Sequence, residues 1–270
     1  MCSSDLKKFI TALLLFSCTV LFAQVVETGH ARASLIADTS FSEEYFYVGI
    51  KLEMDEGWHT YWKNPGDSGG PFTVQWIHEM DIILENPSWP TPEIIPYDPL
   101  ITYGYKNEVI FPVKVFKNID AFLKILEAKL EFLICSDICI PESATLYIDL
   151  SNSPQSAELV QTVKSLTDKI LPIEVQVLEK SLKVNFTYDK PINEAYLFIE
   201  TKDLVRYLPS HAIKKLDEGK YEIELPLENN TFQEIRGNLV IDGNSYLVEG
   251  LNISQQSNSL NIWQAILFAF

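Results

Sequence analysis

The sequence predicts an all-β protein made of two β-sandwich domains joined by one short helix. The first observation behind this prediction is a series of short segments rich in β-branched and aromatic residues, separated by turn-forming residues at the spacing expected of a sandwich. The second is a single stretch of apolar residues at helical spacing in the middle of the chain. The third is size, because 270 residues, 47% of them hydrophobic, suffice for two small domains with a core each.

The predicted first sandwich contains five strands. They cover residues 45–54, 73–77, 109–116, 128–134 and 144–150. Residues 55–71 are rich in Gly and Pro, so this stretch is predicted to be mostly loop. Residues 86–99 carry several prolines, which exclude a helix and favour an extended, irregular path.

The connector and the second sandwich follow. Leu159, Val163, Leu166 and Ile170 fall at helical spacing and predict a helix of about four turns. Asp242-Gly243 has the composition of a two-residue hairpin turn. The predicted strands of the second sandwich are residues 173–177, 182–188, 195–200, 221–225, 238–241 and 246–251.

Both ends of the chain carry apolar segments. Lys7-Lys8 precede an apolar run that ends at Ala23, which predicts a secretory signal peptide over residues 1–23. Residues 1–6 resemble a translated cloning adapter and are set apart from the fold prediction. Residues 256–270 turn apolar and predict the first turns of a truncated transmembrane helix. The predicted domains are therefore 24–152 with the cysteine pair, a helical connector at 153–171, and a second domain at 172–255.

Charge and length exclude two classes of function. The net charge of −16 disfavours nucleic acid, because phosphate binding needs clustered Lys and Arg. The string GDSGGP at 66–71 surrounds the nucleophilic serine of trypsin-like proteases, but only residues 24–67 would precede Ser68 in the mature chain. His59 lies in the same loop as Ser68. We interpret the string as turn chemistry, in which Pro and Gly set the backbone and Asp67 caps it.

One cysteine pair remains once the leader is removed. Cys2 and Cys18 belong to the leader, whereas Cys135 and Cys139 lie in LICSDICIP (133–141). A disulfide needs Cα atoms about 4.4–6.8 Å apart, so the chain must bend between Ser136 and Ile138. Closing a loop this short contributes only ~2 kcal/mol to stability. The spacing alone leaves a redox pair and a local structural disulfide equally open, with Cu(I) binding by two thiolates as a weaker third reading. No other metal site is expected.

Four segments together resemble a known family. They are GWHTYWKNPGDSGGP (57–71), the Trp89-Pro90 stretch, TYGYKNEVIFPV (102–113) and LICSDICIPE (133–142). In combination they resemble the amino-terminal periplasmic region of DsbD-type thiol:disulfide interchange proteins, especially the branch related to the copper-sensitivity suppressor ScsB.

The resemblance implies immunoglobulin-like sandwiches and a periplasmic thiol-disulfide reductase module fed by a membrane relay. Carried over to this sequence, Cys139 is the attacking thiol and Cys135 its resolving partner, with no cofactor beyond their disulfide. The implied partners are periplasmic thioredoxin-fold proteins and the protein's own membrane and thioredoxin-like domains downstream. The implied location is the periplasm, with an anchor in the inner membrane.

The sequence departs from the best-known members in two ways. Its cysteines are closer together, and Thr102 stands where those members have a Phe before Tyr-Gly. Tyr103 or Tyr105 either shields the sulfurs instead or packs on the sheet. Trp58, His59, Tyr61 and Trp62 either shape a partner surface or are core and rim aromatics. His59 would stabilise a thiolate if it lies beside Cys139.

Two further functions remain as alternatives to the reductase module. One is a copper-tolerance or copper-binding exported protein that uses Cys135 and Cys139. The other is a non-catalytic β-sandwich interaction module whose disulfide is structural.

Overall fold

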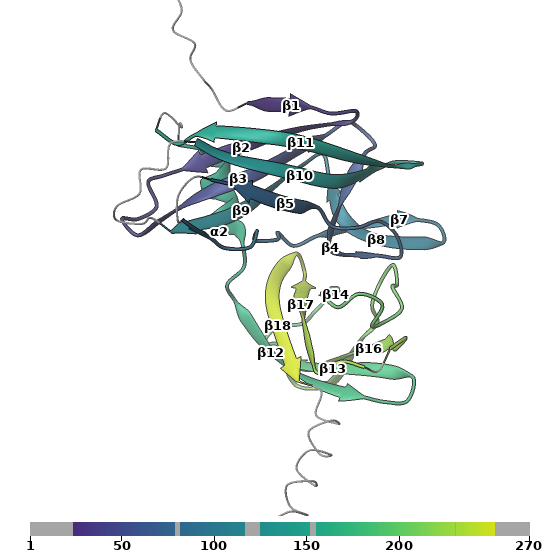
Figure 1. Cartoon of the computed structure of the whole chain (residues 1–270). Helices are drawn as coiled ribbons and strands as arrows, with labels where there is room; N and C mark the ends of the chain where they lie inside the picture. The colour runs from purple at the N-terminus through teal and green to yellow at the C-terminus, as the bar shows by residue number, and fades with distance from the viewer. Residues whose placement is uncertain (1–23, 79–81, 117–124, 152–154, 230, 252–270) are drawn as a thin grey trace, which may run out of the picture.

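The computed structural model describes residues 24–78, 82–116, 125–151, 155–229 and 231–251, and these residues form three sheets and one short helix (Figure 1). The mostly β fold predicted from the sequence is confirmed. The predicted signal peptide (1–23) and membrane segment (256–270) lie outside the described residues. Within the described part of the chain, no helix combines the length and the apolar character needed to cross a membrane.

The first two sheets are built from residues 25–149 and occupy the upper half of Figure 1. The first sheet has the spatial order β1 (Val25–Glu27), β2 (Ala31–Asp38), β3 (Tyr45–Met54), β9 (Glu108–Phe116) and β6 (Ile83–Leu84). The second has the order β11 (Cys139–Asp149), β10 (Ile125–Cys135), β4 (His59–Gly66), β8 (Leu100–Lys106) and β7 (Glu93–Tyr97), with β5 (Thr73–Ile77) also paired to β10.

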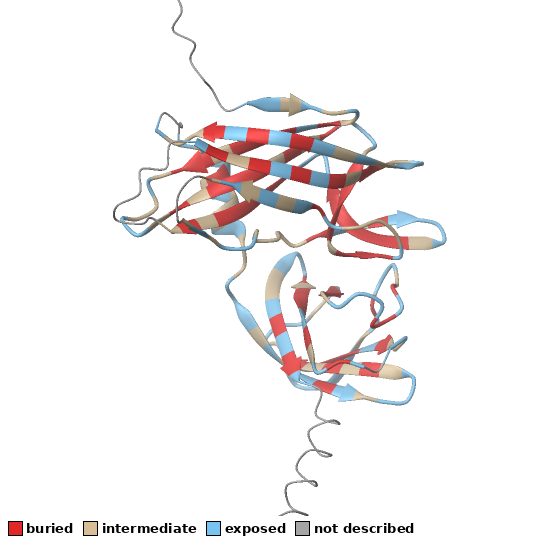
Figure 2. Ribbon diagram, in the orientation of Figure 1, coloured by how far each residue is buried: buried red, intermediate tan, exposed pale blue. Residues whose placement is uncertain are grey.

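These two sheets share one hydrophobic core, which the alternation of buried and exposed residues explains. Along β10 every second residue, from Leu126 to Ile134, is buried, while most of the residues between them are exposed or half-buried. Figure 2 shows the same alternation along β11. Side chains of both sheets contribute to the core cluster, among them Leu35, Ile50, Phe111, Leu130 and Leu146. The face of β10 and β11 that carries the odd-numbered residues is therefore directed away from this core.

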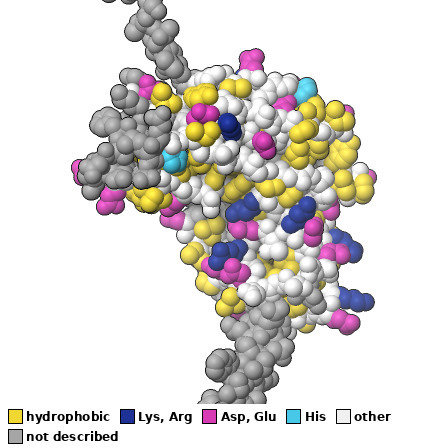
Figure 3. All heavy atoms as spheres, viewed as in Figure 1, with side chains coloured by type: hydrophobic (Ala, Val, Ile, Leu, Met, Phe, Trp, Pro, Cys, Tyr) yellow, Lys and Arg dark blue, Asp and Glu magenta, His cyan; other side chains and the backbone are white. Residues whose placement is uncertain are grey.

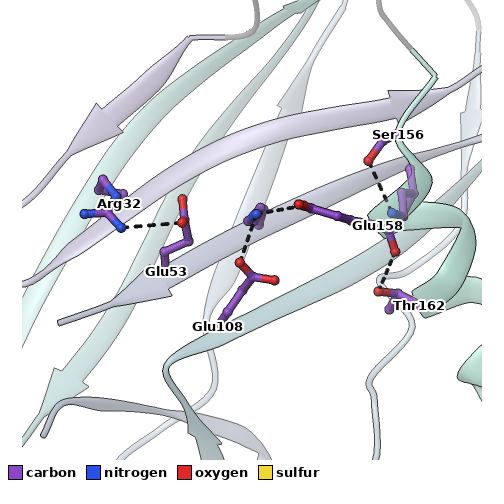
Figure 4. Close-up of polar contacts among 8 residues, drawn as sticks. Arg32, Glu53, Glu108, Ser156, Glu158 and Thr162 are labelled. Carbon is purple, nitrogen blue, oxygen red and sulfur yellow. Dashed lines mark hydrogen bonds and ion pairs between the residues drawn. The ribbon is translucent and has the colours of Figure 1, made fainter. Parts of the chain in front are cut away.

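The helix α2 (Ala157–Ser165) packs on the first sheet rather than standing free as a connector. Ser156 caps its first turn by accepting a hydrogen bond from the backbone N–H of Leu159, and Leu159 is fully buried. Gly49 leaves the space for Leu159, because an added Cβ would lie only 2.9 Å from the Leu159 side chain. Lys51 forms ion pairs with Glu108 (2.9 Å) and Glu158 (2.7 Å), and Figure 4 shows these carboxylates converging on one amine.

The third sheet contains seven strands from residues 170–251 and lies below the others in Figure 1. Its order is β14 (Ala195–Ile199), β17 (Glu234–Ile241), β18 (Asn244–Leu251), β12 (Ile170–Val177), β13 (Ser181–Thr187), β16 (Lys220–Pro226) and β15 (Ile213–Asp217). Within β12, residues 170–172 pair with β18 and residues 173–177 pair with β13. Both halves of the sheet line a second, separate hydrophobic core.

Strand β4 joins the second sheet to the third. The Asn64 side-chain amide donates to the carbonyl of Ile199 (2.7 Å), and Lys63 forms an ion pair with Glu200 (2.7 Å). Asn64 is fully buried, and its carbonyl oxygen accepts from the hydroxyl of Tyr207. This end of β4 is therefore fixed to the third sheet.

Several predicted elements are confirmed and two are wrong. The predicted strands 45–54 and 73–77 coincide with β3 and β5, and Asp242-Gly243 forms the β17–β18 turn with positive φ at both residues. Residues 55–71, predicted as mostly loop, contain β4. The proline-rich residues 86–99 contain no helix and include the extended strand β7, which agrees with the extended path predicted for them. The predicted four-turn helix ends at Ser165, because Ile170 already pairs with Leu247 in the third sheet.

Candidate functional site

The cysteine pair lies at the tip of the β10–β11 hairpin. Cys135 and Cys139 are the last pair in the register, directly opposite each other, and their sulfurs form a disulfide with the Cα atoms 4.2 Å apart. The bend predicted between Ser136 and Ile138 is present, and the backbone N–H of Ser136 donates to the carbonyl of Ile138 (3.0 Å). The hairpin alone therefore brings the two cysteines together.

The two cysteines differ sharply in exposure. Cys135 is 1% exposed, whereas Cys139 belongs to the exposed residues. Ile138, beside Cys139, is 64% exposed although it is apolar. Figure 3 shows hydrophobic side chains gathered on the side of the molecule where this hairpin ends in Figure 1. Cys139 is therefore the sulfur that another protein can reach, and it lies beside an exposed apolar side chain.

Tyr61 of β4 contacts the exposed sulfur. Its hydroxyl oxygen lies 3.2 Å from the Cys139 Sγ, and its ring is 1% exposed. Burial raises the pKa of Tyr61, partly opposed by a hydrogen bond with Ser68, so the hydroxyl stays protonated at neutral pH. A protonated phenol at this distance can donate a hydrogen bond to a thiolate on Cys139.

The GDSGGP segment holds Tyr61 in place. Asp67 exchanges two hydrogen bonds with the backbone of Ile101, one through its N–H (2.9 Å) and one through its carboxylate (2.7 Å). Gly69 has a φ of +87° and lies flat on the Tyr61 ring, where an added Cβ would overlap the ring. The segment is thus a tight turn against the Tyr61 ring, which agrees with the prediction that its match to a protease motif reflects turn chemistry.

His59 lies directly opposite Cys135 in the sheet, on the strand β4. Its ring meets the Tyr61 ring edge to face (5.3 Å between centroids), and it is 9% exposed. Burial lowers the pKa of His59, and the nearby Lys106 ammonium lowers it further, so the imidazole is neutral at pH 7. The condition under which His59 would stabilise a Cys139 thiolate, a position beside Cys139, is not met, because Cys135 lies between the two residues.

The geometry agrees with comparisons to known proteins. Residues 31–151 match the family described as thiol:disulfide interchange protein DsbD, N-terminal. This segment belongs to the DsbD N-terminal family. Its disulfide and the surrounding face lie wholly inside the matched residues.

Solved structures extend the similarity beyond that segment. The crystal structure of the N-terminal periplasmic domain of ScsB from Proteus mirabilis aligns with 85% of this chain and 97% of its own, at 20% identity and a TM-score of 0.68. This likeness shows a shared fold across both parts of the chain. The collagen adhesin of S. aureus aligns at 10% identity over 84% of this chain and 92% of its own. Its TM-score of 0.16 does not indicate a shared fold. No curated protein sequence matches the chain.

Tyr103 and Tyr105 do not cover the sulfurs of this DsbD-type domain. Tyr105 pairs with Thr60, one residue out of phase with His59 and Tyr61, so it points to the opposite face of the sheet and its hydroxyl donates to the Pro90 carbonyl (2.6 Å). Tyr103 lies at the junction with the third sheet, where its hydroxyl meets that of Tyr196 (2.8 Å). The tyrosine that contacts the pair is instead Tyr61, whose hydroxyl lies 3.2 Å from the Cys139 Sγ.

The tryptophans of the same segment are separated. Trp58 is half-buried and stacks on the His30 ring (3.7 Å between centroids), near the start of β2. Trp62 is fully buried in the core and meets Phe198 of the third sheet. Of the four aromatic residues at 58–62, the structure therefore brings His59 and Tyr61 to the cysteine pair. Among the described residues, no three His, Cys, Asp or Glu side chains gather as a metal site would require.

Proposed function

We propose that this chain is a periplasmic thiol-disulfide reductase module that reduces disulfides of partner proteins through Cys139 and Cys135. The observation that carries the proposal is an exposed sulfur bonded to a buried one at the tip of a hairpin. Exchange needs one accessible sulfur for attack and one protected partner that recloses the bond. Membership of residues 31–151 in the DsbD N-terminal family supports the same chemistry.

The reaction proceeds in two displacements. In the reduced protein the Cys139 thiolate attacks one sulfur of the partner's disulfide, which releases one partner thiolate and leaves a mixed disulfide on Cys139. Cys135 then attacks the Cys139 sulfur and expels the second partner thiolate. The partner gains two electrons and two protons, and the protein returns to the Cys135–Cys139 disulfide.

The disulfide is poorly placed to serve as a structural staple. It joins two residues that the hairpin already pairs, at the end of a register that runs from Ile125–Asp149 to Cys135–Cys139. Closing so short a loop removes little entropy from the unfolded chain, ~2 kcal/mol. A bond between distant strands would stabilise the fold more, so exchange accounts better for this position.

The remaining assignments extend this proposal. Both parts of the chain are immunoglobulin-like sandwiches, 24–152 with the redox pair and 172–255 as the second domain, joined by 153–171. A core cluster built from buried residues between Val175 and Val248 supports this division. Residues 1–23 direct export and residues 256–270 begin an inner-membrane anchor. The partners are periplasmic thioredoxin-fold proteins and membrane and thioredoxin-like domains downstream.

Trapping of the mixed disulfide tests this function. In a chain with Cys2 and Cys18 changed to Ser, we expect Cys135→Ser to form a stable, reductant-sensitive adduct with an oxidised periplasmic thioredoxin-fold protein. The matched Cys139→Ser variant should form little, because its remaining thiol is buried. A folded Cys135→Ser protein that forms no adduct would overturn the proposal, as would equal trapping by both variants.

A further inference from the structure

A row of side chains crosses the redox face of the second sheet. Cys139 on β11 is paired with Cys135 on β10, Cys135 with His59 on β4, and His59 with Lys106 on β8. Directly opposed residues of antiparallel strands project from the same face. The row therefore orders these groups from the exposed sulfur inward, with His59 next to the buried cysteine.

The second displacement requires the buried Cys135 thiol to lose its proton, and the row places His59 next to it. Only a thiolate attacks a disulfide, and burial in apolar surroundings disfavours the charged form of a thiol. Cys135 is 1% exposed, so water has poor access to its proton. The step in which Cys135 attacks the mixed disulfide therefore needs a base inside the site.

The register places His59 beside Cys135, and its imidazole is neutral at pH 7. Directly opposed Cβ atoms in an antiparallel pair are about 4.5–5.5 Å apart, which lets an imidazole nitrogen reach a neighbouring sulfur within hydrogen-bond range. The charged groups that face His59 are Lys106 on β8 and, beyond it, Glu93 on β7, whose carboxylate lies 3.6 Å from the Lys106 amine. On its own strand the neighbour is Tyr61, whose hydroxyl remains protonated. The positive charge of Lys106 and burial both keep the imidazole unprotonated and ready to accept a proton.

We propose, on the basis of the thiol exchange proposed above, that His59 is the general base for Cys135. Once Cys139 holds the mixed disulfide, the imidazole nitrogen takes the proton from the Cys135 thiol. The freed sulfur electron pair forms the bond to Cys139 Sγ, and the bond from Cys139 to the partner sulfur breaks. The departing partner thiolate receives the proton from the imidazolium, which restores neutral His59. Charge and protons balance, and no further oxidant or reductant is needed.

A two-step chromogenic assay separates this role from the exchange itself. The reduced chain, with Cys2 and Cys18 changed to Ser, is mixed with dithiobis(nitrobenzoate), and release of coloured thionitrobenzoate is followed by stopped flow. The first equivalent reports the attack by Cys139 and the second reports the attack by Cys135. In a Cys135→Ser chain only the first equivalent should appear.

We expect His59→Gln to slow the second phase about tenfold or more at pH 7, since general bases typically contribute 10²–10⁴-fold, and to leave the first phase within about twofold. The gap should close at alkaline pH, where Cys135 ionises without help. His59→Phe, which keeps a ring against Tyr61, should behave in the same way. His30→Gln is the matched control, because His30 stacks on Trp58 away from the row, and it should leave both phases unchanged.

Each remaining outcome is decisive. Equal second phases in the unsubstituted chain and both His59 variants would overturn the role of His59 while leaving the exchange intact. A slowing that is the same at every pH, or that affects both phases alike, would assign His59 a structural role and also overturn the inference. Absence of the first phase in the unsubstituted chain would instead overturn the proposed function.

Discussion

Tyr61 offers the most direct test of how the fold prepares Cys139. The change Tyr61→Phe removes the hydroxyl that lies 3.2 Å from Cys139 Sγ but keeps the buried ring under Gly69. Packing of the ring is therefore retained, and the hydroxyl's hydrogen bonds to the thiolate and to Ser68 are lost. Hydrogen bonds to charged groups contribute about 1.5–3 kcal/mol, and the weak acceptor character of sulfur places this one at the low end.

The expected effect follows from that value. A loss of about 1.4 kcal/mol lowers the equilibrium between thiolate and thiol about tenfold. Because a more basic thiolate is also a better nucleophile, with a Brønsted slope of about 0.4–0.5, the observed rate of attack should fall only about threefold to fourfold. In a Cys135→Ser chain without Cys2 and Cys18, ultraviolet absorbance of the thiolate gives the first quantity. The rate of alkylation gives the second.

The matched control is Tyr105→Phe. Its hydroxyl donates to the Pro90 carbonyl on the opposite face of the sheet, so this change should leave the thiolate fraction of Cys139 as it was. An unchanged thiolate fraction in Tyr61→Phe would refute the hydrogen bond as a determinant of reactivity. An equal fall in both variants would show that a general loosening of the sheet, rather than this contact, is responsible.

Three further predictions concern stability. Reducing the disulfide should lower the free energy of unfolding in urea by only ~2 kcal/mol; complete unfolding on reduction would contradict an exchange role. Gly69 has a φ of +87° and lies against the Tyr61 ring, so Gly69→Ala should lower the free energy of unfolding by about 1–3 kcal/mol. At Gly70 the nearest neighbour of an added Cβ is 3.7 Å away, so Gly70→Ala should lower it by less than about 0.5 kcal/mol in the same denaturation series. Burial lowers the pKa of His211 to about 4, so the folded protein should lose up to about 3 kcal/mol of unfolding free energy as pH falls from about 6.5 to about 4. His211→Gln should lack this part of the pH dependence. Identical curves of unfolding free energy against pH for the two proteins would refute the prediction.

The sequence predicted correctly those elements whose conformation is determined by their own residue composition. The β-branched and aromatic residues of 45–54 and 73–77 are enough to define β3 and β5. The composition of Asp242-Gly243 likewise defines a turn in which both residues need positive φ. The cysteine spacing predicted the bend that the hairpin tip provides.

Elements that depend on distant partners were missed or misread. β4 contains Pro65 and ends at Gly66, yet it is a strand because β10 and β8, which come later in the chain, pair with it. Ile170 fits the helical spacing of the preceding residues, but its pairing with Leu247 draws it into a sheet. A period of apolar residues does not reveal a partner that far along the chain.

The site was predicted in its chemistry but not in its surroundings. Cys135 and Cys139 were identified from five consecutive positions, whereas the position of His59 depends on a register with a strand more than seventy residues away. Tyr103 and Tyr105 were candidates for shielding because they are aromatic. Only the pairing of Tyr105 with Thr60 reveals that the Tyr105 side chain points to the opposite face of the sheet. The Tyr103 hydroxyl forms a hydrogen bond with the Tyr196 hydroxyl and so lies at the junction with the third sheet.

Strand β4 is held at both ends, which fixes the distance between the cysteine pair and the third sheet. One end carries His59 at the hairpin tip, and the other is clamped to the third sheet through Asn64 about 16 Å away, at ~3.3 Å per residue. Cys139 lies on β11, two strands from this anchored strand, because β11 pairs with β10 and β10 pairs with β4 at His59. The proposed function therefore requires each electron donor and each acceptor to dock at the tip of the β10–β11 hairpin, one after the other.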